Sequence, residues 1–320
     1  MTDTPARPGR KEVAWAQVAE RGSRFGIRLM VWIHLHLGRR VTGILLYPVV
    51  AYFWLVAGEA RRASRIYFDH LERHAPGSTP PRPLLGRTFR HFYVFASMIV
   101  DRLRLWTGHY EDFEIEIHGR EAMQPLIEAG RGAVFLGAHL GSFDVLRVIA
   151  RDAKIPVTVV MFTANARRIN DMLGELHPDS AFRTIEIDPQ SIRAGFEIRS
   201  CIERGEFVAV LADRVAPGGR NRVDQVSFLG AKALFPEGPF RLPMLLHLPV
   251  VLCLALRRGP GRYEVFLETL AEGAKEPPSR RDELIHRNIA RFAERLEHYA
   301  AMEPYQWFNF YDFWAGGADS

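Results

Sequence analysis

The spacing of hydrophobic and polar positions changes after the first third of the chain. From residue 113 onward, short apolar runs alternate with stretches in which apolar residues recur every three or four positions. This pattern is typical of buried strands that alternate with amphipathic helices. We expect strands at residues 113–118, 133–138, 156–162, 184–187, 207–212, 249–257 and 263–270. We expect helices at residues 120–129, 142–153, 166–176, 191–204, 237–247 and 281–301. The alternation predicts an α/β fold with a mostly parallel central sheet flanked by helices, whose last strand is an antiparallel hairpin partner.

The N-terminal part of the chain follows a different pattern. Residues 27–37 are mostly apolar, and residues 41–57 contain no charged side chain. As a helix, the second run is about 25 Å long, slightly shorter than the hydrocarbon core of a bilayer. Pro48 is expected to kink it, and arginines flank it on both sides. We predict two short membrane-associated helices that enter or lie on the cytoplasmic leaflet. The alternative is a buried hydrophobic helix of a soluble core.

Prolines and glycines mark the clearest boundary, at residues 76–84. We therefore divide the chain into a disordered start with the membrane-associated helical segment (1–75), a Pro-rich linker (76–84) and an α/β domain (85–320). This domain begins with a long amphipathic pattern at residues 85–108, which should pack on the sheet as a helix.

Composition narrows the classes of protein. The 320 residues are 48% hydrophobic and 25% charged, as expected for a globular chain with a large core. The net charge of +5 accompanies no nucleic-acid-binding motif, so we expect no nucleic-acid partner. The first forty residues hold eight arginines or lysines and three acids, which suits an anionic lipid surface or an acidic carrier protein. Cys201, Cys253 and the histidines show no metal-ligand spacing, and no metal is expected.

The residues after the strand at 133–138 carry the most chemical information. His139 follows the strand, Gly141 and Ser142 form a tight turn, and Asp144 falls in the first turn of the next helix. Open α/β sheets bind their ligands at the carboxyl ends of strands. A carboxylate that orients an imidazole makes it a general base, so we interpret His139 and Asp144 as a candidate catalytic pair. Acids also favour helix starts for dipole reasons alone, and the pair by itself leaves both readings open.

Other polar groups are expected near the same edge of the sheet. The free backbone N–H groups around Gly141 and Ser142 can supply part of an oxyanion site. Asp213 and Arg214 end the strand at 207–212, where they either form an ion pair that shapes the site or let Arg214 hold a substrate anion. The remaining candidates for substrate binding are Arg147, Asn165, Arg167 and Arg168, which follow the dyad or the strand at 156–162.

The segment from His139 to Asp144 resembles the His-x4-Asp motif of the lysophospholipid acyltransferase superfamily, in particular its branch of bacterial lipid A biosynthesis acyltransferases. Residues 211–214, 228–230, 235–242 and the aromatic segment 304–314 follow in the order of that branch, and the resemblance covers about residues 15–314. It implies a glycerolipid acyltransferase-like fold, with His139 as general base oriented by Asp144. The chain has Asp213-Arg214 where many lipid A enzymes have Asp-Gln, which puts lipid A itself in doubt as the acceptor.

The resemblance implies a membrane-associated enzyme at the cytoplasmic face of the bacterial inner membrane. Such an enzyme moves a fatty acyl chain from a carrier thioester to a hydroxyl or amine of a lipid acceptor. Acyl carrier protein or coenzyme A would bring the acyl chain as co-substrate, with no other cofactor. Its partners would be the lipid bilayer and acyl carrier protein. The alternative is a catalytically inactive lipid- or carrier-binding protein on the same fold.

A second motif needs a separate interpretation. Residues 235–238 read Phe-Pro-Glu-Gly, identical to the phosphate-binding motif of glycerolipid acyltransferases. In those enzymes the motif directly follows the strand that here ends at Asp213. We therefore assign Glu237 a structural role at the start of a helix. An esterase is a poorer interpretation, because the chain contains no Gly-x-Ser-x-Gly sequence.

Overall fold

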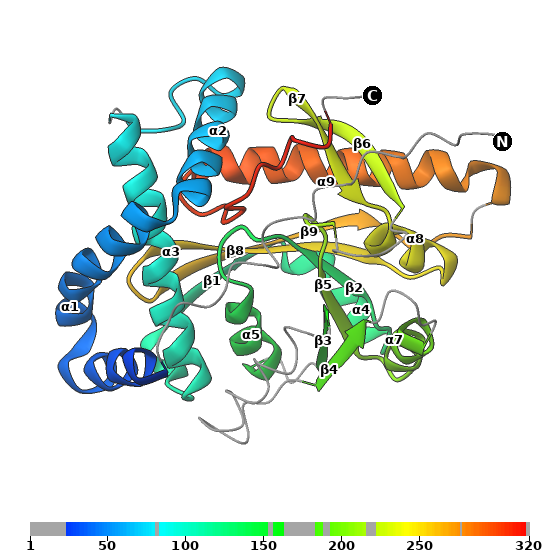
Figure 1. Cartoon of the computed structure of the whole chain (residues 1–320). Helices are drawn as coiled ribbons and strands as arrows, with labels where there is room; N and C mark the ends of the chain where they lie inside the picture. Colours follow the sequence, from blue (N-terminus) through cyan, green and yellow to red (C-terminus); the bar gives the residue numbers. More distant parts are fainter. Residues whose placement is uncertain are drawn as a thin grey trace, which may run out of the picture.

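The computed structural model describes residues 24–80, 83–152, 156–162, 183–187, 193–215, 222–275 and 277–317. Figure 1 shows a twisted central sheet with helices on both of its faces. The helix expected at residues 166–176 lies outside the described residues.

The central sheet has seven strands in the described part of the chain, in the order β1-β9-β8-β2-β5-β3-β4. Their bounds are β1 (Glu114–His118), β2 (Val134–Gly137), β3 (Val157–Phe162), β4 (Arg183–Ile187), β5 (Phe207–Leu211), β8 (Val250–Gly259) and β9 (Arg262–Ala271). Neighbouring strands are parallel except for the antiparallel β8–β9 hairpin. The mostly parallel α/β fold and the hairpin partner are both confirmed.

Strand β2 lies in the middle of the sheet and is buried along its whole length. Val134 and Leu136 point into one core, whereas Phe135 points into the core on the opposite face. A strand that is covered on both faces needs an uninterrupted apolar run, which is why this segment does not alternate with polar residues.

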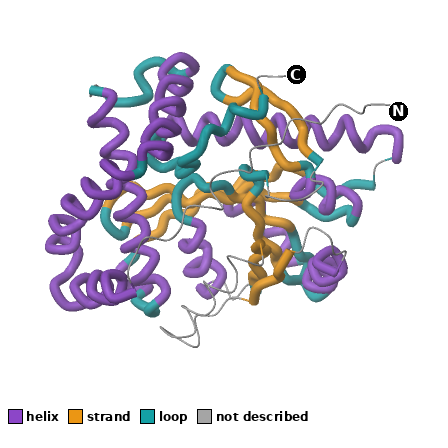
Figure 2. The backbone as a smooth tube through the Cα atoms, in the orientation of Figure 1, coloured by secondary structure: helices purple, strands orange, loops and turns teal. Residues whose placement is uncertain are grey.

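Helices form the outer layers, as Figure 2 shows. The core on one face includes side chains of α2 (Gly58–His74), α7 (Arg193–Glu203), α8 (Gly238–Leu245) and α9 (Arg281–Met302). The core on the other face includes side chains of α3 (Leu84–Trp106), α4 (Gln124–Glu128) and α5 (Leu146–Asp152). The predicted helix at 142–153 is split, because a short 3-10 turn at Phe143–Val145 precedes α5. The turn before α4, at Arg120–Ala122, is likewise a 3-10 helix.

An antiparallel hairpin that we did not expect lies beside this sheet. It consists of β6 (Val223–Phe228) and β7 (Ala231–Pro236), and it buries Phe228 and Phe235 completely. Its two-residue turn has positive φ angles at Leu229 (49°) and Gly230 (77°). Such turns usually begin with asparagine, aspartate or glycine. Because leucine takes this position here, the sequence lacks the usual signal of a hairpin.

The N-terminal helices differ in how they pack. Helix α1 (Arg24–Val56) is broken at Gly38, whose φ of 78° and ψ of 177° are not helical, so two helices form as expected. Among the described residues, Gly38–Val56 is the helix that is long and apolar enough to cross a bilayer, and 17% of it is buried. This finding rests on length and composition alone. Helix α2, by contrast, buries Tyr67 and Phe68 in the core of the sheet.

Glu237 lies at the start of α8, as expected from its place in the sequence. Its carboxylate accepts hydrogen bonds from Arg241, one of them at 2.7 Å, and Arg241 also pairs with Asp282 of α9 at 2.9 Å. The Phe-Pro-Glu-Gly sequence is therefore part of a contact that joins the two helices. Cys201 and Cys253 are both buried and free.

Candidate active site

Strand register places His139 beside Asp213. In the parallel pair β2–β5, Gly137 lies opposite Leu211, and the N–H of Ala212 donates to the carbonyl of Gly137 at 2.9 Å. His139 and Asp213 each follow their strand by two residues, so they leave the sheet side by side. The imidazole Nδ1 lies 2.8 Å from one carboxylate oxygen of Asp213, and the backbone N–H of His139 donates to the other at 2.9 Å.

The carboxylate of Asp213 is fully buried and held from several sides. Besides the two contacts with His139, it accepts hydrogen bonds from Trp307 Nε1 at 3.2 Å and from Asn309 Nδ2 at 2.9 Å. A carboxylate can only accept, so the hydrogen between the two side chains belongs to Nδ1 of His139. That tautomer leaves the Nε2 lone pair free to take a proton.

The Nε2 atom of His139 makes no hydrogen bond with the described residues, and 27% of the imidazole is exposed. Burial lowers the pKa of His139, an effect that Asp213 opposes and that Arg214 and Arg102 reinforce. Burial alone would raise the pKa of Asp213, but His139 and Arg214 outweigh it and lower that pKa to about 2. The pair therefore combines a neutral, accessible imidazole with a permanently charged carboxylate behind it.

Asp144 makes different contacts from those we expected. The sequence suggested that its carboxylate orients the imidazole, but Asp213 occupies that place on Nδ1. Asp144 instead accepts a hydrogen bond from Trp106 Nε1 at 2.8 Å and pairs with Arg102 Nε at 2.6 Å. Both partners belong to α3, so Asp144 ties the first turn after β2 to that helix. A catalytic role of Asp144 stays a prediction.

The turn after His139 is also more tightly bonded than expected. The N–H of Gly141 donates to the carbonyl of Gln306 at 2.9 Å, and the N–H of Ser142 donates to that of Ala255 at 2.8 Å. The expectation that these two groups are free to hold an oxyanion is therefore wrong. Gly141 has a φ of 74°, and a Cβ atom there would lie 2.0 Å from the carbonyl oxygen of Ala255. Only glycine can bring the turn this close to β8.

Arg214 leaves the sheet next to Asp213 and contacts the C-terminal segment. Its Nε donates to Asn309 Oδ1 at 2.6 Å, and its Nη2 donates to the carbonyl of Phe308 at 2.9 Å. The sequence leaves two roles open for Asp213 and Arg214, an ion pair or a substrate-anion site. In the described part of the chain, the hydrogen bonds of Asp213 join it to His139, Trp307 and Asn309, whereas the charge of Arg214 lowers the pKa of Asp213. Four predicted residues lie outside the described part of the structure. They are Asn165, Arg167 and Arg168, together with the side chain of Arg147 in α5.

Two residues of the C-terminal segment were missed in the sequence. Aromatic residues of this segment close the core, because Trp307, Phe313 and Trp314 are buried. The same segment also supplies Trp307 and Asn309 to the carboxylate of Asp213. A buried polar Asn309 within an aromatic run was the available signal, because such groups are buried only with partners.

Three groups elsewhere on the sheet have the composition of a metal site. The ligand atoms of Glu116, His118 and Glu264 lie within 4.8 Å of one another on β1 and β9. These side chains are partly exposed, and Glu264 already pairs with Arg258 at 3.0 Å. Their arrangement is that of a surface ion-pair network.

The fold and the His139–Asp213 pair define an α/β protein with a candidate general base at the carboxyl edge of its sheet. Residues 81–315, more than half of the chain, match the family model described as bacterial lipid A biosynthesis acyltransferase. The chain therefore belongs to this family of acyltransferases. None of the curated proteins matches it.

Proposed function

We propose that this protein moves a fatty acyl chain from a carrier thioester to a hydroxyl or amine of a lipid acceptor. The observation that carries the proposal is the His139–Asp213 pair at the carboxyl edge of the sheet. A buried carboxylate holds Nδ1, and none of the described residues bonds to Nε2. Such an imidazole can accept a proton while its positive charge is balanced from behind. Family membership supplies the acyl group as the species that is transferred.

The proposed reaction needs no covalent enzyme intermediate. His139 Nε2 removes the proton from the acceptor as its oxygen or nitrogen attacks the thioester carbonyl. The tetrahedral intermediate then expels the carrier thiolate, which takes the proton back from the imidazolium. Asp213 keeps Nδ1 protonated and stabilises the cation during the reaction. The carrier, acyl carrier protein or coenzyme A, is a co-substrate, and we propose no further cofactor or metal.

We also propose that the protein binds to the cytoplasmic face of the bacterial inner membrane. The supporting observation is the apolar face of α1, where Ile44 is 70% exposed and Leu55 is 65% exposed. Exposed apolar surface of this extent on one helix is unusual for a soluble monomer. The basic character of the chain supports acyl carrier protein as the partner that delivers the acyl group.

The test uses the purified full-length protein with lipid extract and either acyl-carrier protein or acyl-coenzyme A. We expect a lipid whose mass increases by one acyl chain, together with release of the free carrier thiol. The same extract with His139→Ala should yield neither product. Acylation by His139→Ala at the rate of the unmodified protein would exclude His139 as the base.

The inactive lipid- or carrier-binding protein remains the second candidate. It would bind vesicles or carrier protein as tightly as an active enzyme but release no thiol with any acceptor fraction. Fractionation of cells tests the membrane part separately, because we expect the full-length protein in the membrane fraction at physiological salt. Recovery in the soluble fraction without detergent would contradict that part of the proposal.

A further inference from the structure

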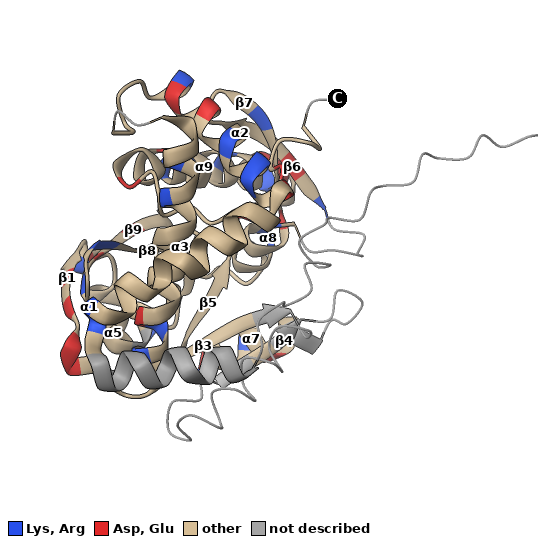
Figure 3. Cartoon of the chain, turned by 60° about the vertical axis from the view of Figure 1, so that its left-hand side comes forward, with Lys and Arg blue, Asp and Glu red and all other residues tan. Residues whose placement is uncertain are grey.

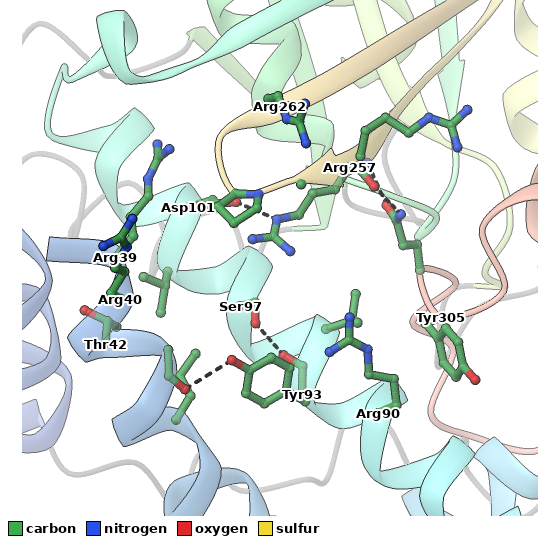
Figure 4. A pocket seen from close by; sticks show the side chains of 18 of the residues that line it. Arg39, Arg40, Thr42, Arg90, Tyr93, Ser97, Asp101, Arg257, Arg262 and Tyr305 are labelled. Carbon is green, nitrogen blue, oxygen red and sulfur yellow. Dashed lines mark hydrogen bonds and ion pairs between the residues drawn. The ribbon is translucent and has the colours of Figure 1, made fainter. Parts of the chain in front are cut away.

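A cavity of about 1040 Å³ lies between α1, α3, the β8–β9 hairpin and the C-terminal segment. Figure 4 shows side chains from all four of these elements around it. Its lining includes Gln306 but neither His139 nor Asp213. The link to the active site is the backbone of Gln306, whose carbonyl accepts the N–H of Gly141 at 2.9 Å. The cavity therefore does not contain the His139–Asp213 pair, and Gln306 connects its lining to the turn that follows His139.

The lining of this cavity is strongly basic. Six arginines contribute to it against two acidic residues, Asp101 and Glu303. The arginines are Arg39, Arg40, Arg90, Arg257, Arg258 and Arg262. They come from α1, α3 and the β8–β9 hairpin, as Figure 4 shows for five of them. Guanidinium groups gathered around one space repel each other unless an anion compensates them.

The acidic residues compensate only part of this charge. Asp101 accepts a hydrogen bond from Arg257 Nε at 2.9 Å, and it accepts a second from the buried hydroxyl of Tyr263 at 2.9 Å. Glu303 pairs with Arg258, which also contacts Glu264 at 3.0 Å. Both carboxylates of the lining are thus committed to the two arginines of β8.

Three other arginines have no carboxylate partner among the described residues. These are Arg40 of α1, Arg90 of α3 and Arg262 of β9, and all three are exposed. Arg90 lies over the ring of Tyr93 at 5.6 Å, a contact that leaves its charge uncompensated. The guanidinium fork suits phosphate oxygens, which it can bind with two parallel hydrogen bonds.

Beyond Arg39, Arg40 and Thr42, the part of the lining that α1 contributes is apolar. Ile44 and Tyr47 line the cavity, yet they are 70% and 51% exposed and belong to the apolar outer face of that helix. Figure 3, which turns α1 forward, shows its second half without charged residues. Arg39 and Arg40 immediately precede this uncharged stretch. A basic pocket that borders an exposed apolar helix matches an amphiphile with an anionic head.

We propose that this cavity binds the phosphate headgroup of an anionic membrane phospholipid, whose acyl chains lie along the exposed face of α1. The inference rests on the proposed membrane association but not on the proposed reaction. Arg40, Arg90 and Arg262 hold the phosphate from three elements, so a bound lipid joins α1 to α3 and to the β8–β9 hairpin. A free phosphate would satisfy the arginines but not the apolar wall.

The test measures vesicle binding by the full-length protein in flotation assays. Vesicles of phosphatidylcholine alone are compared with vesicles that also contain phosphatidylglycerol. The triple variant Arg40→Gln, Arg90→Gln, Arg262→Gln removes the charges of the three exposed arginines and keeps Arg39, which donates to the carbonyl of Asp112 at 2.9 Å. The matched control, Arg120→Gln, Arg131→Gln, Arg287→Gln, removes three exposed arginines that do not line the cavity. Both variants change the net charge by the same amount.

We expect the cavity variant to bind phosphatidylglycerol vesicles about a hundredfold more weakly than the unmodified protein. The affinity of the control variant for the same vesicles should fall by less than about tenfold. Binding to phosphatidylcholine vesicles should be equal for all three proteins. Equal losses in the two triple variants would show diffuse surface attraction and overturn the proposal. Should the cavity variant misfold, the single variants Arg40→Gln, Arg90→Gln and Arg262→Gln replace it, and each must bind phosphatidylglycerol vesicles more weakly than the single control Arg120→Gln.

Inorganic phosphate and glycerol phosphate distinguish the two sources of the ligand. We expect neither to displace the vesicles at millimolar concentration, and efficient displacement would assign the cavity to a soluble phosphate instead. His139→Ala separates this proposal from the proposed reaction, because it should bind vesicles normally while losing acyl transfer. If the unmodified protein transfers acyl chains but binds vesicles equally with and without the three arginines, the lipid site alone is overturned. If it binds vesicles through the three arginines but transfers no acyl chain, the reaction alone is overturned.

Discussion

Two histidines lie close to Trp307 but differ in what surrounds them. His91 of α3 is buried, with Nδ1 2.9 Å from the Ser64 hydroxyl and Nε2 2.8 Å from the carbonyl of Trp307. Because a carbonyl can only accept, Nε2 carries the proton and Nδ1 accepts from Ser64. Both ring nitrogens of His91 are therefore occupied, whereas only Nδ1 of His139 has a hydrogen-bond partner in the described part of the chain.

The charge behind the two rings differs as well. Burial lowers the pKa of His91 to about 4, and its partners are a hydroxyl and a carbonyl without charge. Burial also lowers the pKa of His139, but the carboxylate of Asp213 opposes that effect. The contact between Ser64 and His91 therefore does not activate the serine as a nucleophile. The imidazole of His91 is buried away from any substrate and stays uncharged at neutral pH. A usable base needs an open nitrogen and a compensating carboxylate together.

The largest effect expected is that of His139→Ala on acyl transfer. Loss of a general base should lower turnover at least about a hundredfold, measured as release of the carrier thiol. The fold should be kept, because the imidazole is partly exposed. His91→Gln is the matched control and should keep turnover per folded molecule. A large loss of turnover in His91→Gln with normal folding would contradict the comparison.

A smaller loss is expected when the carboxylate partner is removed. Asp213→Asn should lower turnover by about tenfold or more, since the amide neither compensates the imidazolium nor fixes its tautomer. Because Asp213 raises the pKa of His139, the acid limb of the pH–rate profile should also move to lower pH. Asp144→Asn should cost less and leave that limb in place. The reverse order would restore Asp144 as the orienting acid.

Trp307 contacts Asp213 through its indole and His91 through its backbone carbonyl. A substitution can therefore remove the first contact and keep the second. Trp307→Phe deletes the Nε1 donor to Asp213 while the backbone carbonyl still accepts from His91. The loss of one hydrogen bond to a charged group should lower turnover by about fivefold. Trp314→Phe removes a comparable buried donor, which bonds to the carbonyl of Phe228 at 3.0 Å, and should leave turnover unchanged. Equal effects would mean that core packing alone is responsible.

His91 should affect how the free energy of unfolding depends on pH, but it should not affect turnover. In the folded protein its pKa is lowered from 6.5 to about 4, so the unfolded chain binds more protons between these values. The free energy of unfolding should therefore fall as the pH drops from 6.5 to 4, by about 3 kcal/mol from this residue. Urea unfolding at several pH values should show a shallower fall for His91→Gln. Parallel curves for the two proteins would disprove this assignment.

The sequence placed the candidate base, His139, at the edge of the sheet but did not predict its contact with Asp213. A histidine after a buried strand in an α/β chain is expected at the carboxyl edge, and that inference needs only local patterns. Asp144 was the nearest acid in the sequence. Asp213 is closer in space because β2 and β5 pair with Gly137 opposite Leu211. Strand order and register depend on contacts between distant segments, and local spacing contains no information about them.

The same reason explains the other differences. The strands and most helices follow from hydrophobic periodicity, which is a local property. The occupied N–H groups of Gly141 and Ser142 depend on the C-terminal segment and on β8, which are far away in the sequence. The basic cavity unites arginines from α1, α3 and the β8–β9 hairpin. Each of these arginines alone has the appearance of an ordinary surface residue.

The partners of Asp213 also set the order in which activity can arise during synthesis. His139 and Asp213 follow β2 and β5, whereas Trp307 and Asn309 lie 94 and 96 residues after Asp213 in the sequence. Until that segment leaves the ribosome, the carboxylate lacks two of its donors and the turn after His139 lacks the carbonyl of Gln306. A nascent or C-terminally truncated chain therefore contains His139 and Asp213 without the groups of the C-terminal segment that hold them. Residues 306–309 therefore complete the surroundings of the candidate site only after His139 and Asp213 have been synthesised.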